Sequence, residues 1–188
     1  MNSNKKENIA FTLAVFSENT VGILNLISIV FSRRGINVES ISASATVIPG
    51  ITKTTILAFS DRDTMEKVVA QIEKAIFVVK AFLFVDDEII HQEVALYKVP
   101  TEKLIGEEYL EKIIRTYNAR ILDITAEYTV IEKTGHTDET EALFNELKKY
   151  DILQFVRSGR VCVTKDPVEH VTEYLKMREE QKNNLKNQ

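Results

Sequence analysis

One order of predicted strands and helices occurs twice along this chain, and this repeat constrains the fold more than any other feature. In the first copy, Ile9, Phe11, Leu13 and Val15 alternate with other residues, which predicts a half-buried strand. The predicted order is strand, helix, strand, strand, helix, strand, over residues 9–16, 23–31, 36–47, 51–60, 65–72 and 77–85.

The same order restarts about 80 residues further along, after the acidic joint Asp86–Glu88. Its predicted elements lie at residues 91–99, 110–117, 119–127, 128–134, 143–147 and 152–164. The pattern predicts an α+β fold with two tandem βαββαβ (ferredoxin-like) units, each an antiparallel sheet with two helices on one face. We expect the domains at residues 8–86 and 90–165, followed by a charged helical or disordered tail at 166–188.

Local signals refine these boundaries. Asn19 is a candidate cap for the first helix and Gly35 a candidate stop, while Ser60 or Asp61 can cap the second helix. Within residues 36–47, one face of the predicted strand carries Glu39, Ile41, Ala43 and Ala45. In the tail, Val171, Tyr174 and Leu175 form one short apolar stripe, so the tail is either a solvated or frayed helix end or a docking helix for a partner.

Composition excludes several classes of protein. The net charge is −4, with 24 basic and 28 acidic residues, and the basic residues are scattered, which argues against nucleic-acid binding. No run approaches the roughly 18 apolar residues of a membrane span. The polar start MNSNKKEN does not fit a signal peptide, so we expect a cytoplasmic protein.

Residues for catalysis or metal binding do not form a recognisable pattern. His91, His136 and His170 fall in different predicted elements without ligand spacing, and Asp86–Glu88 suits a solvated linker. Cys162 is the only cysteine, which excludes an internal disulfide and a cysteine-based zinc cluster. We therefore expect no catalytic residue, no metal site and no cofactor in this chain.

The loop between the first strand and the first helix, Ser17–Leu24, is the best candidate for ligand binding. A helix N-terminus presents unpaired N–H groups and favours a carboxylate. Gly22 leaves the backbone open to a ligand, and Asn19 offers both a donor and an acceptor to an amino-acid zwitterion. The alternative is structural: Asn19 caps the helix and Gly22 allows tight packing of the helix on the sheet.

Several strings of residues resemble those of one known family. They are EN-x-x-G-I-L at 18–24, FSRRGINVESI at 31–41, ILDIT at 121–125, YTV at 128–130, TG at 134–135 and RSG at 157–159. On these residues the chain, from about residue 9 to 164, resembles the small regulatory subunits of acetolactate synthase (acetohydroxyacid synthase).

The resemblance implies an N-terminal ACT domain that dimerises with a second copy and binds a branched-chain amino acid, valine first, at the interface. The charged end of the effector would meet Asn19, Thr20, Val21 and Gly22. Asn37 would act from the facing protomer, and the ligand's side chain would lie near Ile23, Leu24 and Val38.

The resemblance also implies that the chain stimulates the catalytic large subunit and confers feedback inhibition, in valine, leucine and isoleucine biosynthesis. Thiamine diphosphate, magnesium and FAD would belong to the large subunit. The alternative is a stand-alone ACT protein that regulates another enzyme or a transcription factor. Two departures stand out: residues 45–52 lack the acidic hairpin loop common among relatives, and the tail beyond about residue 168 is longer.

Overall fold

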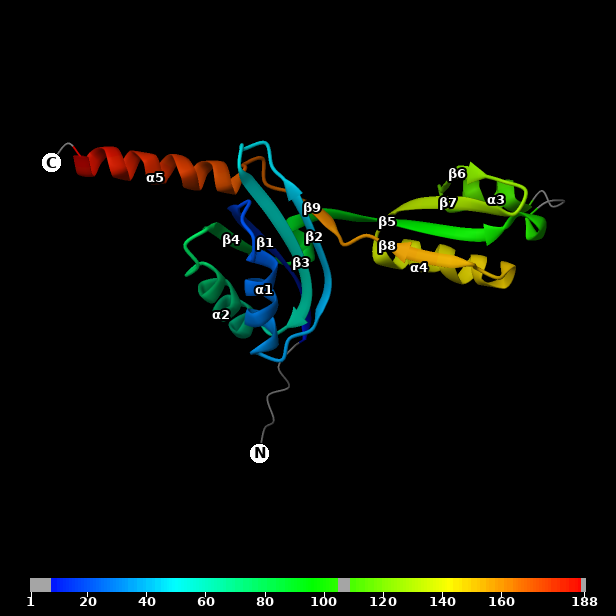
Figure 1. The fold of residues 1–188 in the computed structure, drawn as a ribbon, viewed down its shortest axis with the longest axis horizontal. Coiled ribbons are helices and arrows are strands. Elements are labelled where there is room, and N and C mark those ends of the chain that lie inside the picture. The colour runs from blue at the N-terminus through cyan, green and yellow to red at the C-terminus, as the bar shows by residue number, and fades with distance from the viewer. Residues whose placement is uncertain (1–7, 105–108, 187–188) are drawn as a thin grey trace, which may run out of the picture. The chain divides into compact units, whose positions relative to one another are not determined.

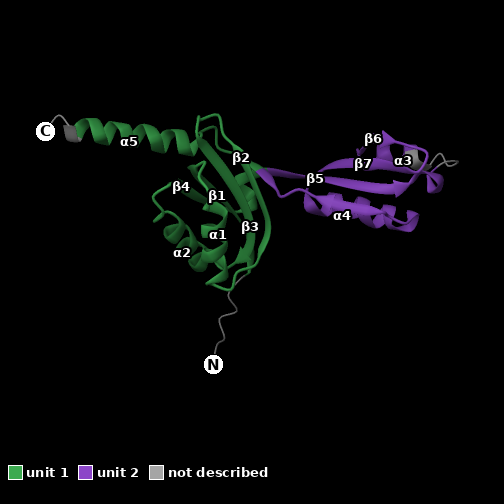
Figure 2. Cartoon of the chain, viewed as in Figure 1, with its two compact units in different colours: residues 1–90, 162–188 green, residues 91–161 purple. Residues whose placement is uncertain are grey.

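The computed structural model describes residues 8–104 and 109–186, which form two compact units. The first unit combines the chain up to Ile90 with the segment from Cys162 onward, and the second comprises His91–Val161 (Figure 2). The C-terminal segment therefore joins the first unit, whereas the sequence suggested a separate tail after a second domain that ended at residue 165.

A four-stranded antiparallel sheet forms the centre of the first unit, in the order β2-β3-β1-β4. Helices α1 and α2 cover one of its faces (Figure 1). The strands are β1 (Ile9–Glu18), β2 (Val38–Ala45), β3 (Ile51–Ser60) and β4 (Val78–Phe84), and the helices are α1 (Ile23–Ser32) and α2 (Arg62–Ile72). The predicted βαββαβ order is confirmed.

Two of the predicted caps are confirmed and one is wrong. Asp61 caps α2, since its carboxylate accepts hydrogen bonds from the Thr64 amide at 3.0 Å and the Thr64 hydroxyl at 2.8 Å. Gly35 ends the turn after α1 with a φ of +64°. Asn19 does not cap α1. The helix begins after Gly22, which has a φ of +97°, and no side chain of the described residues forms a capping hydrogen bond there.

The face predicted for β2 also needs a correction. The register shifts between Val38, which is opposite Ala58, and Ser40, which is opposite Leu57. The extra residue in this β-bulge is Glu39, which is exposed, and Val38 packs against the core in its place.

The second unit repeats the architecture with the sheet order β6-β7-β5-β8. Its core contains Tyr97, Val99, Ile131, Leu143 and Leu147. Its elements are β5 (Ile89–Pro100), α3 (Tyr109–Thr116), β6 (Arg120–Ile124), β7 (Tyr128–Gly135), α4 (Thr137–Leu147) and β8 (Gln154–Arg157), with short 3-10 turns at Thr101–Lys103 and Lys148–Tyr150. The 3-10 turn Asp86–Glu88 and nearly all of strand β9 (Val161–Thr164) belong to the first unit.

The strand predicted at residues 152–164 is two strands, β8 and β9, which both pair with β5. Ser158 separates them, because its amide donates to the Val94 carbonyl at 2.8 Å and its hydroxyl donates to the Gly159 carbonyl at 2.9 Å. These bonds end β8 at a turn, which local apolar content alone does not reveal.

Helix α5 (His170–Lys186) packs its first turns on the face of the first sheet opposite α1 and α2. Val171 is 1% exposed and contacts the cluster of Ala14 and Phe16, with Leu175 beside it. The predicted apolar stripe of the tail is thus confirmed for its first turns, while residues 176–184 are exposed. Among the described residues, no helix combines the length and apolar character needed to cross a membrane.

Tyr97 lies fully buried in the second unit and donates its phenolic hydrogen to the Thr140 carbonyl at 2.6 Å. Burial raises the pKa of Tyr97 well above its ordinary value, because the phenolate would lose its hydration; nearby Arg157 opposes the rise and Glu93 adds to it.

We expect the stability difference between wild type and Tyr97→Phe to shrink as the pH rises above about 10. The unfolded chain releases its phenol proton near pH 10 while the folded chain keeps it, so Tyr97 contributes less to folding above that pH. At neutral pH the variant should lose about 0.5–1.5 kcal/mol with the hydrogen bond. Urea titrations from neutral to alkaline pH measure both, and a difference independent of pH would contradict the assignment.

Candidate effector site

The loop Asn19–Gly22 joins the end of β1 to the start of α1 and is anchored through its backbone. The Asn19 amide donates to the Gly50 carbonyl at 3.0 Å, and the Thr20 amide donates to the Glu18 carbonyl at 2.8 Å. The first of these bonds fixes the loop to the turn of the β2–β3 hairpin. The start of α1 is therefore held next to the far end of the edge strand β2.

The predicted residues of this loop lie together at one end of α1. Asn19, Thr20 and Val21 are exposed, Ile23 is buried, and Leu24 is 49% exposed. The free N–H groups of a helix's first turn give such a loop the capacity to bind a carboxylate. The loop presents polar groups to solvent with an apolar side chain, Leu24, next to them.

Gly22 is required by its backbone conformation rather than by close packing. Its φ of +97° is unfavourable for residues with a side chain, yet a Cβ atom at this position would have no heavy atom of the described residues within 4 Å. The interpretation that Gly22 allows tight packing of helix on sheet is therefore wrong. The open space above the glycine is the feature that suits a ligand.

Asn37 lies at the opposite end of α1, before the first residue of β2. Helix α1 has 10 residues, so its two ends are about 15 Å apart along the axis. The Asn37 side chain is exposed and donates to the Glu39 carboxylate at 3.2 Å. A single copy of the chain does not bring Asn19 and Asn37 to one small ligand.

A groove of about 410 Å³ runs between α1 and β2. It is lined by Leu24, Asn37 and Val38, so it connects three of the predicted residues. Sequence reasoning missed Ser28, Phe31 and Ile41, which also line it. The helical spacing of Leu24, Ser28 and Phe31, which places them on one face of α1, is the signal that could have found them.

Within residues 8–104 and 109–186, strand β2 lies at the edge of the first sheet and pairs with β3 alone. Its outer edge therefore carries backbone N–H and C=O groups available to another strand. The groove and this edge are continuous, because both follow β2 from Asn37 onward.

The histidines and the cysteine considered for chemistry lie at several separate places in the described part of the chain. The rings of His91 and His136 lie 4.6 Å apart, a contact that sequence reasoning missed, while His170 lies 3.6 Å from Asp166. Cys162 is buried. No group of three or more His, Cys, Asp and Glu side chains is placed to hold a metal ion among the described residues.

Both halves of the chain match family models. Residues 13–80 match the ACT domain of acetohydroxyacid synthase (AHAS) small subunits, and residues 92–166 match the model described as the small subunit of acetolactate synthase. The acetolactate synthase small subunit of Mycobacterium leprae is 32% identical over 156 residues, which cover 83% of this chain and 92% of the relative.

The chain belongs to the acetolactate synthase small-subunit family. A probable small subunit from Archaeoglobus fulgidus is 30% identical over 82% of this chain and 96% of its own length. The crystal structure of the small subunit from Thermotoga maritima superimposes with a TM-score of 0.76 at 25% identity and covers 85% of this chain and 99% of that one. The ACT-type, ferredoxin-like fold predicted for this small subunit is thereby confirmed.

We predict that Gly22→Ala destabilises the first unit by about 1–2 kcal/mol, because alanine is strained at this positive φ. Gly22→Asn should cost less than Gly22→Ala although its side chain is larger, since asparagine tolerates left-handed backbone. Urea unfolding of the three chains checks this order. If the larger side chain were the more damaging one, crowding rather than backbone conformation would explain the glycine.

Proposed function

We propose that this chain stimulates the catalytic large subunit of acetolactate synthase and makes it subject to feedback inhibition by a branched-chain amino acid. Membership of the small-subunit family supports the partner. The observation that carries the effector proposal is the open helix N-terminus at Asn19–Gly22, held at the far end of the unpaired edge strand β2.

A homodimer through the first units would complete the site. If two β2 edges pair antiparallel about a twofold axis, the start of one strand lies beside the end of the other. Asn37 precedes the start of β2, and the loop Asn19–Gly22 is bonded to the hairpin turn beyond its end. Asn37 of one copy would then reach the loop of the other copy, which it cannot reach in its own.

The proposed contacts divide by chemistry. Asn19, Thr20, Val21 and Gly22 would hold the charged end of the effector with amide and backbone groups. The second copy's Asn37 would add a carboxamide. The branched side chain would lie near Ile23, Leu24 and Val38, the last two of which line the groove.

The binding free energies available from apolar contacts limit how well this site can discriminate between branched-chain amino acids. Burial of an isopropyl group contributes about 1.5–3 kcal/mol, and one methylene more or less changes binding by about 1–3 kcal/mol. Valine, leucine and isoleucine differ by at most one methylene group, and we propose valine first because of the family resemblance. Coupling of about 1–3 kcal/mol between effector and large subunit would suffice for feedback.

We further propose that the chain is non-catalytic, works in the cytoplasm and binds no cofactor of its own. Thiamine diphosphate, magnesium and FAD would be held by the large subunit.

Titration of purified large subunit with this chain tests the function. We expect acetolactate formation per large subunit to rise to a plateau, and valine to inhibit only the mixture. The chain alone, supplied with pyruvate and the three cofactors, should form no acetolactate. If the large subunit's rate and its response to valine both stay constant across the titration, the chain regulates something else.

Mixed dimers test the two-copy site. Asn19→Ala and Asn37→Ala should each abolish high-affinity effector binding, because each removes polar contacts from every site. Mixing the two variants should restore about a quarter of the sites, since each heterodimer recovers one site with both asparagines and loses both from the other. Calorimetry before and after mixing measures this recovery. No recovery after verified subunit exchange would place both residues in a site formed by one chain.

A further inference from the structure

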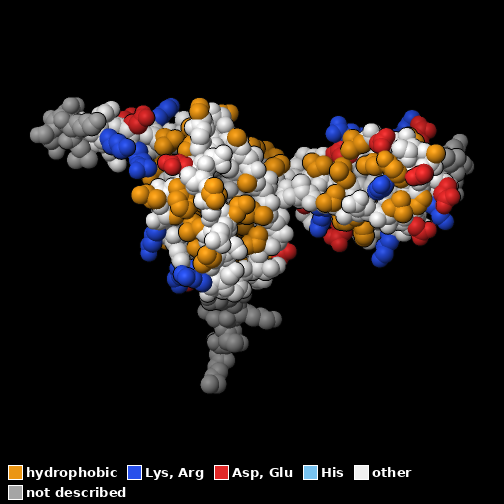
Figure 3. Space-filling model, viewed as in Figure 1, with side chains coloured by type: hydrophobic (Ala, Val, Ile, Leu, Met, Phe, Trp, Pro, Cys, Tyr) orange, Lys and Arg blue, Asp and Glu red, His pale blue; other side chains and the backbone are white. Residues whose placement is uncertain are grey.

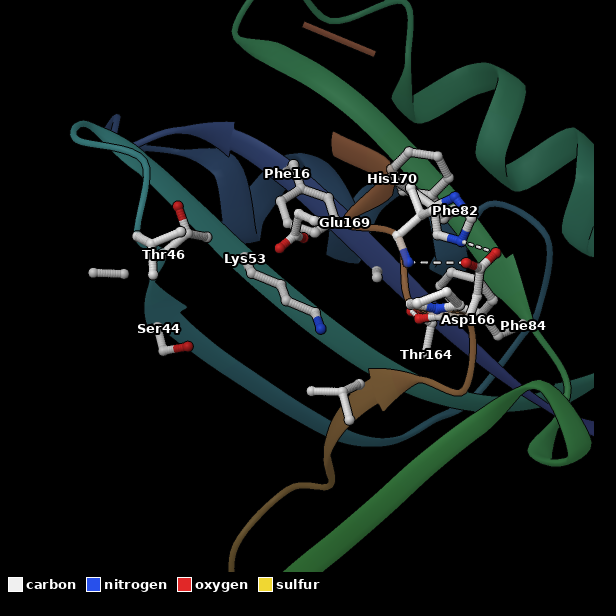
Figure 4. Close-up of a pocket in the computed structure, with 16 residues that line it drawn as sticks. Phe16, Ser44, Thr46, Lys53, Phe82, Phe84, Thr164, Asp166, Glu169 and His170 are labelled. Carbon is white, nitrogen blue, oxygen red and sulfur yellow. Dashed lines mark hydrogen bonds and ion pairs between the residues drawn. The ribbon is translucent and has the colours of Figure 1, made fainter. Parts of the chain in front are cut away.

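A second hollow, of about 430 Å³, lies on the face of the first sheet opposite the helices α1 and α2 (Figure 4). Its floor comes from β1, β3 and β4, and its wall is the segment from Val163 to His170 that leads into α5. The volume falls in the lower part of the range of about 300–1,000 Å³ that is typical of small-molecule sites. All of its lining residues belong to the first unit.

The floor of this hollow is aromatic. Phe82 lies at its centre, with its ring centroid 5.9 Å from that of Phe16 and 6.3 Å from that of Phe84. The imidazole of His170 closes one side at 5.4 Å from Phe82. Such a floor favours an apolar side chain, and its ring faces also attract a cation.

The walls carry opposite charges. Lys53 projects from β3, and its ammonium donates to the Cys162 carbonyl at 2.7 Å, which uses one of its three N–H donors. Glu169 lies on the wall that leads into α5, with Asp166 beside it. Figure 4 shows Lys53 and Glu169 around the same hollow as the three phenylalanines.

Asp166 serves to shape the wall. Its carboxylate accepts the Val168 amide at 2.9 Å and lies 3.6 Å from the His170 imidazole. Glu169 is exposed and carries the wall's second carboxylate. Because Asp166 is engaged within the wall, Lys53 and Glu169 are the charged groups best placed to bind a ligand.

Half of the wall, from Pro167 to His170, lies outside the part of the chain that the family models match, which ends at residue 166. Pro167, Val168, Glu169 and His170 therefore add a side to the sheet beyond that part. The hollow is also separate from the groove between α1 and β2, since the two lie on opposite faces of the sheet.

We propose that this hollow is a second site for a free amino acid with an apolar side chain. The ligand's carboxylate binds the Lys53 ammonium, its ammonium binds the Glu169 carboxylate, and its side chain packs on Phe16, Phe82 and Phe84. This assignment concerns binding by the chain alone and does not rest on the proposed regulation of the large subunit.

The test uses L-leucine and the full chain labelled with fluorophenylalanine, in the Asn19→Ala, Asn37→Ala background that disables the effector site. We expect leucine to shift the fluorine signals of Phe16, Phe82 and Phe84 in a saturable way. The analogues 4-methylpentanoate, which lacks the ammonium, and leucinamide, which lacks the carboxylate, should bind about tenfold or more weakly, because each loses one charged hydrogen bond.

Variants with matched controls test the proposed contacts of Lys53 and Glu169 with leucine. Lys53→Gln and Glu169→Gln should each weaken leucine binding about tenfold or more. The controls Lys74→Gln and Glu173→Gln change the same charges at exposed positions that do not line the hollow and should bind leucine as the parent does. Glu169→Gln alters an exposed side chain, so it stays informative if Lys53→Gln disturbs the packing of Cys162.

Three outcomes would overturn the proposal. They are the absence of saturable ring shifts with leucine, equal binding of leucine and both analogues, and unchanged affinity in Glu169→Gln. None of these depends on acetolactate formation, so the second site can fail while the proposed function stands, and the reverse also holds.

Discussion

The burial of β1 on both faces is the constraint on which the first unit depends. Phe11, Leu13 and Val15 point into the core beneath α1 and α2, while Ala14 and Phe16 point to the opposite face, which α5 covers in part. Strand β1 also pairs along its length with β3 and along much of it with β4. A strand held on both edges and both faces is a rigid support from which a loop or pocket can be positioned accurately.

Both proposed sites use this support. The effector loop begins where β1 ends, and Phe16, three residues before Asn19, contributes to the floor of the second hollow. The β2–β3 hairpin links them again, since Thr46 lines the hollow and Gly50 accepts the Asn19 amide. On the face of this unit that Figure 3 shows, apolar side chains are spread over the surface and charged side chains lie mainly toward its margins. Two ligands bound on opposite faces of the same strands would influence each other reciprocally, to whatever extent each alters the position of β1 or the hairpin.

Periodicity predicted the order of elements because each element buries a face at its own spacing, and those spacings survive in the structure. Periodicity failed to predict two features: a contact between residues far apart in the sequence, and an unusual backbone conformation. The pattern of residues 9–16 predicted a half-buried strand, but Phe16 lies in a second cluster that includes Val171 and Leu175, more than a hundred residues later, and local periodicity cannot report such contacts. By residue type, Asn19 was a better candidate than Gly22 for the N-cap of α1. The residue before α1 has a positive φ, however, and this conformation is seen only in the structure.

Two buried hydroxyl groups in the first sheet lie near the effector loop. The hydroxyl of Ser17, two residues before the loop, and that of Thr54, opposite Val15 on β3, are buried without a hydrogen-bond partner among the described residues. A buried hydroxyl without a partner costs about 1–3 kcal/mol, so this part of the first unit is not optimised for stability alone. Local preferences are violated most often at functional sites, where a ligand or a second chain completes what one folded chain leaves open. The two hydroxyls and the open space above Gly22 lie near the loop that joins β1 to α1, beside the hairpin end of the edge strand β2. This is the end of α1 at which we propose that an effector and a second copy of the chain bind.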